Sequence, residues 1–226
     1  MRTPIMAGNW KMNCDNSAAV ALAEGIAKCA CDGAACEAVI CPPFTALSAV
    51  SQAIADTPIA LGGQNLFWEP SGAFTGEISA DMLLSCGCSF VIVGHSERRG
   101  RFGAVTDDFT DEMQSVFGDN DATVNRKLKA AADAGLKPIA CCGELLSERE
   151  QGMTDVVVAN QVRAMLDGCS PEQLAATTIA YEPVWAIGTG EVCEADEANR
   201  VCGLIRATVA EVAGEQVAAS MRILYG

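Results

Sequence analysis

A histidine, a glutamate and a lysine stand where extended segments give way to a loop or a helix. His95 is the only histidine of the 226 residues, and it follows the apolar run 90–93 and Gly94 directly before a serine that can begin a helix. The free N–H groups at the start of a helix disfavour a positive charge, so an imidazole at that place can stay neutral.

Two further segments carry groups of complementary chemistry. Glu182 follows the β-branched run 177–179 and precedes a glycine-containing loop, so it falls at or just past the end of a strand as a candidate base. Asn9 and Lys11 lie two residues apart, which in an extended segment turns both toward one side. Taken singly, each group also fits an ordinary structural or solvated residue. Together they favour a site.

The chain resembles the triosephosphate isomerase family in motifs spread over almost its whole length. These are GNWKMN at 8–13, GQN at 63–65, GAFTGE at 72–77, VIVGHSERR at 91–99, CCGE at 141–144, YEPVWAIGTG at 181–190 and RILYG at 222–226. The resemblance implies the interconversion of dihydroxyacetone phosphate and D-glyceraldehyde 3-phosphate through an enediol, without a cofactor, in glycolysis and gluconeogenesis.

The resemblance also implies a role for each residue. Glu182 is the base, His95 polarises the carbonyl, Lys11 supplies positive charge, and Asn9, Lys11 and Gly188 bind substrate. Glu97 orients this cluster as a supporting residue. Residues 183–190 resemble the family's lid, which excludes water from the reaction.

Composition limits the partners of the chain. The net charge of −14 argues against nucleic acid and anionic membranes, since both require clustered basic residues. A phosphate ligand would be attracted locally by Lys11 and by helix N-termini. No apolar run reaches the length of a membrane span and no leader precedes the first motif, so we expect a soluble cytoplasmic protein.

Twelve cysteines are numerous for 226 residues, but their spacing is not that of a metal or redox motif. There is no C-x-x-C, and a single histidine could assist in binding a metal. We therefore expect no metal site, and we interpret most of the cysteines as small buried apolar residues in a reducing compartment.

Short apolar runs alternate with helical patterns along one undivided chain. Strands are predicted at 4–9, 37–41, 58–63, 90–93, 137–142, 178–181 and 221–224, and helices at 17–30, 46–55, 125–134, 156–166 and 196–212. This pattern indicates an α/β fold and a single domain over residues 1–226. Because the candidate residues come from the ends of three strands, we predict a TIM (β/α)8-type barrel rather than a doubly wound sheet.

Two segments differ from an ordinary βα connection. Residues 104–118 are acidic, follow Phe102-Gly103 and end in a repeated Phe117-Gly118. They are interpreted as an insertion with no catalytic role, either a solvated loop or an extra helical turn. The long loop 64–79 carries Phe67, Trp68 and Phe74, which favour a partner surface. The resemblance implies a homodimer in which Thr75 reaches the other subunit, although a loop folded onto its own barrel is the alternative.

The 226 residues end at the seventh predicted strand, so the eighth β/α unit is absent from this chain and its barrel is C-terminally incomplete. The resemblance implies that this unit carries further glycines that bind the phosphate. A catalytically impaired isomerase fragment and a non-catalytic binder of phosphorylated sugars therefore remain alternatives to an active isomerase.

Overall fold

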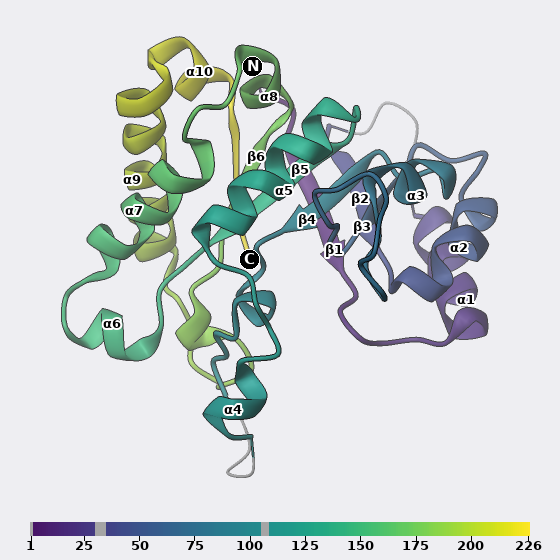
Figure 1. The fold of residues 1–226 in the computed structure, drawn as a ribbon, viewed down its shortest axis with the longest axis horizontal. Coiled ribbons are helices and arrows are strands. Elements are labelled where there is room, and N and C mark those ends of the chain that lie inside the picture. The colour runs from purple at the N-terminus through teal and green to yellow at the C-terminus, as the bar shows by residue number, and fades with distance from the viewer. Residues whose placement is uncertain (1, 30–34, 105–108) are drawn as a thin grey trace. The chain divides into compact units, whose positions relative to one another are not determined.

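The computed structural model describes residues 2–29, 35–104 and 109–226, in which strands and helices alternate (Figure 1). The strands are β1 Ile5–Asn9, β2 Glu37–Cys41, β3 Ala60–Gly63, β4 Phe90–Val93, β5 Lys137–Cys142, β6 Thr178–Tyr181 and β7 Arg222–Tyr225. The helices are α1 Asn16–Ala27, α2 Leu47–Ala53, α3 Ala80–Ser85, α4 Asp111–Gln114, α5 Asp121–Asp133, α6 Leu146–Glu150, α7 Thr154–Leu166, α8 Pro171–Ala176, α9 Ala195–Ala213 and α10 Glu215–Ser220. Three short 3-10 turns are η1 Phe44–Ala46, η2 Ser96–Arg99 and η3 Val184–Ala186.

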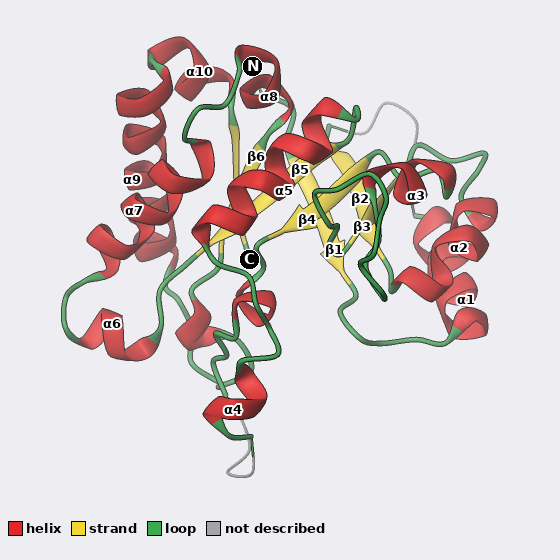
Figure 2. Ribbon diagram, viewed as in Figure 1, coloured by secondary structure: helices red, strands yellow, loops and turns green. Residues whose placement is uncertain are grey.

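The strands follow one another in the sheet in the order of the sequence, from β1 to β7. Figure 2 shows the strands in yellow and the helices in red. The pairs β1–β2, β2–β3, β3–β4 and β6–β7 are parallel. A doubly wound sheet reverses its strand order at a switch point, whereas a (β/α)8 barrel adds each strand beside the previous one. The predicted α/β class is therefore confirmed, and the strand order is that of the barrel, with seven strands in the described residues.

The chain forms two compact units, which we describe separately. The first contains residues 1–93 and 129–139, and the second contains residues 94–128 and 140–226. Strand β5 begins in the first unit and ends in the second. The interpretation of residues 1–226 as a single domain stays a prediction.

The first unit contains β1 to β4 and the helices α1, α2 and α3. Asp15 caps α1, because its carboxylate accepts hydrogen bonds from the Ala18 N–H at 2.9 Å and the Ser17 hydroxyl at 2.8 Å. Ala19 and Ala23, one helical turn apart, are fully buried on α1, which packs against α2. The interior is filled by apolar side chains of β2 to β4 and their helices, among them Val39, Val50, Leu61, Leu83, Phe90 and Val91.

The second unit contains the end of β5, the strands β6 and β7, and the longest helix, α9. Val201, Ile205 and Val209 repeat at intervals of four residues along α9 and are fully buried. This face packs against α7, α10 and β7. Strand β6 is buried throughout, as expected for a parallel strand that is covered on both faces.

The first and last strands are covered less completely than the others. Met6 of β1 is 67% exposed, and in β7 the first three residues are half-buried and Tyr225 is 50% exposed. The apolar runs at these two places predicted the strands correctly, but they do not determine burial, because burial depends on neighbours from distant parts of the chain.

The predicted strands are confirmed, and β2, β4, β5 and β6 have the predicted bounds. The predicted helices are also present, with ends shifted by a few residues; residue 30, the predicted end of the first helix, lies outside the described residues. Among the described residues, four helices of five or six residues were not predicted, namely α3, α6, α8 and α10. Such short helices contain too few turns to display a helical period.

The extended geometry predicted through Lys11 is wrong. Strand β1 ends at Asn9, and Lys11 has a φ of 52°, in the left-handed region. The Asn9 side-chain oxygen accepts the Lys11 N–H at 2.9 Å, and the Asn13 amide donates to the Trp10 carbonyl at 2.7 Å. These local hydrogen bonds compete with strand geometry and turn the chain.

The cysteines of the described residues are all free thiols. Cys41, Cys88, Cys141, Cys142 and Cys193 are buried, whereas the other described cysteines are partly or fully exposed. The interpretation that most are buried is therefore wrong for this part of the chain, because several of them lie at the ends of helices and in loops.

Part of the predicted insertion, residues 105–108, lies outside the described residues. The remainder contains α4, whose first turn is capped by the Thr110 side chain through the Met113 N–H at 3.3 Å. This is the extra helical turn that was one of the two predicted forms. Its origin as an insertion stays a prediction.

Candidate active site

The backbone turns sharply between β4 and His95. Gly94 has a φ of 66°, and a Cβ at this position would lie 2.6 Å from a methyl group of Val124. Only glycine fits both the left-handed conformation and this close packing. Gly94 therefore directs His95 away from the strand and into the turn η2.

The His95 ring is held at both nitrogens, with 7% of the residue exposed. Its Nδ1 accepts the Glu97 N–H at 3.2 Å, and its Nε2 lies 3.0 Å from Glu182 Oε1. Because Nδ1 accepts a hydrogen bond, the proton of a neutral ring lies on Nε2 and points to the carboxylate. The predicted helix start is present as a 3-10 turn, although its cap is His95 itself and not a following residue.

Glu182 lies one residue past β6, as predicted, and is 8% exposed. Its backbone N–H donates to the Cys142 carbonyl at 2.8 Å, which continues the pairing of β5 and β6. Its carboxylate accepts the Ser96 N–H at 3.1 Å through Oε2 and faces His95 through Oε1. The strand end and the turn η2 thus present an imidazole and a carboxylate to each other in direct contact.

Cys141 lies beside the carboxylate as a protonated thiol. Burial, and then the negative charge of Glu182, raise the pKa of Cys141 well above its ordinary value. The thiol therefore keeps its proton and donates it in a hydrogen bond to the Glu182 side chain.

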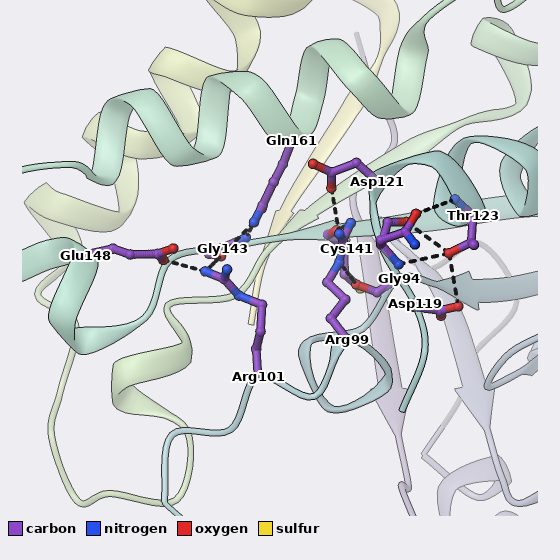
Figure 3. Close-up of polar contacts among 11 residues, drawn as sticks. Gly94, Arg99, Arg101, Asp119, Asp121, Thr123, Cys141, Gly143, Glu148 and Gln161 are labelled. Carbon is purple, nitrogen blue, oxygen red and sulfur yellow. Dashed lines mark hydrogen bonds and ion pairs between the residues drawn. The ribbon is translucent and has the colours of Figure 1, made fainter. Parts of the chain in front are cut away.

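Two arginines connect the turn after β4 to the end of β5 (Figure 3). Arg99 donates to the Gly94 carbonyl at 2.7 Å, to Asp121 at 2.6 Å and to the Cys141 carbonyl at 3.3 Å. Arg101 donates to the Gly143 carbonyl at 3.2 Å and forms an ion pair with Glu148. A planar guanidinium with several fixed donors is suited to holding such separate groups in one arrangement.

The predicted lid, residues 183–190, is bonded within itself. The Ile187 N–H donates to the Val184 carbonyl at 3.1 Å, and the Thr189 hydroxyl donates to the Trp185 carbonyl at 2.8 Å. The Glu191 N–H in turn donates to the Thr189 hydroxyl at 3.1 Å. Val184 and Trp185 are buried, whereas the segment 188–190, with Gly188, is exposed.

Trp185 anchors the first half of the lid between two charged residues. Its Nε1–H donates to Glu144 at 2.9 Å, and the Arg149 guanidinium lies 4.2 Å from the centre of its rings. Glu144 is fully buried and also accepts the Tyr181 hydroxyl at 3.1 Å. Burial and the Glu144 charge raise the pKa of Tyr181, which stays a hydrogen-bond donor.

Of the remaining predicted residues, the structure places one in contact with His95. Glu97 contacts His95 through its backbone N–H, while its carboxylate lies 3.7 Å from Nδ1. Asn9, Lys11 and the exposed Thr75 belong to the first unit, so their position relative to His95 stays a prediction.

Sequence reasoning gave no role to several residues that bond to the predicted site residues or to the predicted lid. The Ser96 N–H binds the carboxylate of Glu182, Glu144 holds Trp185, and Gln64 donates to the Lys11 carbonyl at 2.8 Å and to the Cys41 carbonyl at 2.9 Å. Glu144 and Gln64 belong to the motifs CCGE and GQN, which were visible as signals. A backbone donor such as the Ser96 N–H could not be predicted, because nearly every residue type carries a backbone N–H.

This arrangement has the parts of a proton-transfer enzyme on an α/β barrel. A carboxylate follows one strand, an imidazole follows another in direct contact with it, and the predicted lid begins directly after the carboxylate. Among the described residues, no group of three or more histidine, cysteine, aspartate or glutamate side chains could hold a metal ion.

Comparison with known proteins defines the class further. The model of the triosephosphate isomerase family matches residues 4–226. The triosephosphate isomerase of Chloroflexus aurantiacus is 46% identical over 226 residues, which cover 100% of this chain and 84% of the relative. Those of Clostridium perfringens and Symbiobacterium thermophilum are 46% and 45% identical over the whole chain, which covers 85% and 82% of their lengths. The chain belongs to the triosephosphate isomerase family.

Proposed function

We propose that the protein interconverts dihydroxyacetone phosphate and D-glyceraldehyde 3-phosphate, a step of glycolysis and gluconeogenesis. The observation that carries the proposal is the contact of 3.0 Å between His95 Nε2 and Glu182 Oε1, with His95 Nδ1 bonded to a backbone N–H. Membership of the triosephosphate isomerase family supports the same substrates.

Glu182 acts as the base in this proposal. Its carboxylate removes a proton from one carbon of the substrate and returns it to the neighbouring carbon, so the hydrogen changes position while the substrate keeps its composition. The neutral His95 donates its Nε2–H to the carbonyl oxygen and stabilises the enediol, a pairing known for this family. No cofactor is required.

Asn9 and Lys11 bind the substrate in this proposal. The Lys11 ammonium attracts the phosphate against the net charge of −14 and stabilises negative charge that develops on the enediolate. The conformation of Lys11 is supported by Asn9 and by Gln64, which bond its backbone N–H and carbonyl.

The lid completes the site in this proposal. The Gly188 N–H, in its exposed half, donates to the phosphate, and lid closure excludes water from the enediol. Glu97 supports the orientation of His95 through its backbone N–H.

The first experiment is a coupled isomerisation assay of the 226-residue polypeptide beside a version extended by an eighth β/α unit from a relative. We expect kcat/KM of the 226-residue form to be lower by a factor of at least about 100, because loss of a preorganised donor to a charged group costs on the order of 10²–10³ in rate. Equal kcat/KM for the two forms would show that the added unit contributes nothing to phosphate binding. Absence of activity in both would contradict the proposed function.

We also propose a homodimer formed through the loop 64–79. Phe67 stacks on Trp68 with ring centres 4.0 Å apart and contacts Phe74 at 4.4 Å. Phe74 remains 42% exposed and Thr75 is exposed, so the tip of this loop offers apolar surface to a partner.

Thr75→Arg should weaken association of the subunits, because it brings a charge into a packed contact. Sedimentation equilibrium measures the expected increase in the dissociation constant of at least about tenfold, equivalent to roughly 1.4 kcal/mol. Gln52→Arg, an exposed position on α2, is the matched control and should leave association unchanged. A monomeric parent chain would contradict the dimer.

A cytoplasmic location is part of the same proposal, since glycolysis supplies and consumes the proposed substrates there. No helix within the described ranges is long and apolar enough to cross a membrane.

A further inference from the structure

Two Phe-Gly pairs flank the acidic segment after the turn η2, and their rings meet. The Phe102 and Phe117 ring centres lie 5.4 Å apart, and Phe109 packs edge-on against Phe102 at 5.3 Å. Phe109 and Phe117 are 6.3 Å apart, so the three rings form one group, which we call the phenylalanine cluster. The chain therefore leaves and returns at nearly the same place, and aromatic contacts hold the two ends together.

The two glycines have different surroundings. A Cβ on Gly103 would lie 2.3 Å from the Ile187 carbonyl oxygen and 2.4 Å from the Val184 carbonyl oxygen. A Cβ on Gly118 would meet nothing within 4 Å. The backbone at Gly103 thus packs directly on the first half of the lid, whereas a side chain at Gly118 would have open space.

The residue that follows the second pair makes contacts away from the lid segment. Asp119 follows Gly118, donates its N–H to the Arg98 carbonyl at 3.0 Å and forms an ion pair of 2.6 Å with the buried Lys127. The first Phe-Gly pair therefore contacts the lid, and the residue after the second pair fastens the chain to α5.

We infer that Gly103, backed by the phenylalanine cluster, is a positioning residue for the lid. Its close contact keeps the Val184 carbonyl in place to accept the Ile187 N–H at 3.1 Å, the hydrogen bond that shapes the first half of the lid. Gly118 has no equivalent contact, because a Cβ there would meet nothing within 4 Å. The kinetic part of this inference rests on the proposed function, whereas the structural part does not.

The test compares Gly103→Ala with Gly118→Ala, which add the same methyl group. Hydrogen exchange of the peptide that contains Ala186 and Ile187 is the direct readout. We expect Gly103→Ala to increase exchange of these amides by about tenfold, roughly the effect of losing one net hydrogen bond, because the methyl group displaces the Val184 carbonyl. Gly118→Ala should leave exchange unchanged. Equal exchange in the two variants would overturn the inference.

A second variant separates support of the lid from general instability. Phe109→Ala removes a ring from the phenylalanine cluster and leaves Gly103 in place, and it should raise exchange of the same amides by a smaller factor than Gly103→Ala. Exchange of the α9 amides serves as the internal reference and should not change in either variant. An equal increase in α9 would indicate global destabilisation and contradict a specific role.

Kinetics distinguish failure of this inference from failure of the proposed function. In whichever of the two forms, the 226-residue polypeptide or the extended version, shows isomerase activity, Gly103→Ala should lower kcat by about tenfold or more relative to Gly118→Ala. A small misplacement of a covering loop reduces the rate strongly. A change in lid exchange without any isomerase activity in the parent would retain the inference and reject the proposed function. Unchanged hydrogen exchange of the lid amides in Gly103→Ala, in an active enzyme, would retain the proposed function and reject the inference.

Discussion

Replacing Glu182 by glutamine should lower kcat by about 10³, within the range of 10²–10⁴ that general acid-base catalysis contributes, and leave KM nearly unchanged. Glutamine keeps the shape of the side chain but cannot take up a proton. Its amide group also cannot accept from both donors that the carboxylate serves, the Ser96 N–H at 3.1 Å and His95 Nε2 at 3.0 Å. The loss falls on the transition state, because proton abstraction occurs only there.

The measurement is a full Michaelis analysis of the form that shows isomerase activity, either the 226-residue polypeptide or the version extended by an eighth β/α unit. Circular dichroism verifies folding. Glu211→Gln is the matched control, since Glu211 lies on the exposed face of α9 and pairs only with Arg163 among the contacts described. It should leave kcat unchanged. An unaltered kcat in Glu182→Gln would remove Glu182 from the mechanism.

Alanine at position 143 should lower kcat/KM by at least about 100-fold, because a displacement of roughly 1 Å at a reacting group costs that much. A Cβ on Gly143 would lie 1.7 Å from the Glu182 carbonyl oxygen. Gly143 cannot easily withdraw, since its N–H donates to Gln161 Oε1 at 2.8 Å and its carbonyl accepts from Gln161 Nε2 at 3.2 Å (Figure 3). The Glu182 backbone must therefore move.

The same substitution should also lower the free energy of unfolding by about 1–3 kcal/mol, the usual cost of overpacking. Urea unfolding measures this loss, and kinetics at a temperature where both proteins are folded isolate the effect on positioning. Gly203→Ala in α9, where a Cβ meets nothing within 4 Å, is the control. It should be neutral or stabilising by up to about 1 kcal/mol through helix propensity. Normal kcat/KM in Gly143→Ala would show that the backbone of β5 moves to accommodate the methyl group and that Glu182 keeps its position.

The sequence predicted the strands well because each is a short apolar run between polar or glycine-rich segments. Phe90–Val93 and Thr178–Tyr181 are buried on both faces, so their composition is unambiguous. The short helices had weaker signals. One of them, α8, could have been predicted from Ser170, Pro171 and Gln173, which form a capping box with proline at the first helical position.

The candidate site was predictable where chemistry and strand ends coincide, as for His95 and Glu182. The conformation of Lys11 was not, because the hydrogen bond from its N–H to Asn9 overrides the alternation of a strand. Gly143 was also inaccessible to such reasoning. Its importance comes from its distance to a backbone atom of another strand, which no pattern along the chain encodes.

The hydrogen bonds within the lid have a consequence for the entropy of substrate binding. Ordering a free backbone residue costs about 1–2 kcal/mol, so fixing a flexible loop of several residues would consume much of the binding free energy of a small ligand. Here the Thr189 hydroxyl donates to the Trp185 carbonyl and accepts the Glu191 N–H. These two hydrogen bonds restrict the backbone of the exposed half of the loop, so that, if residues 183–190 act as the predicted lid, less conformational entropy is lost when the loop covers a substrate. More of the interaction with the substrate remains for stabilising the transition state.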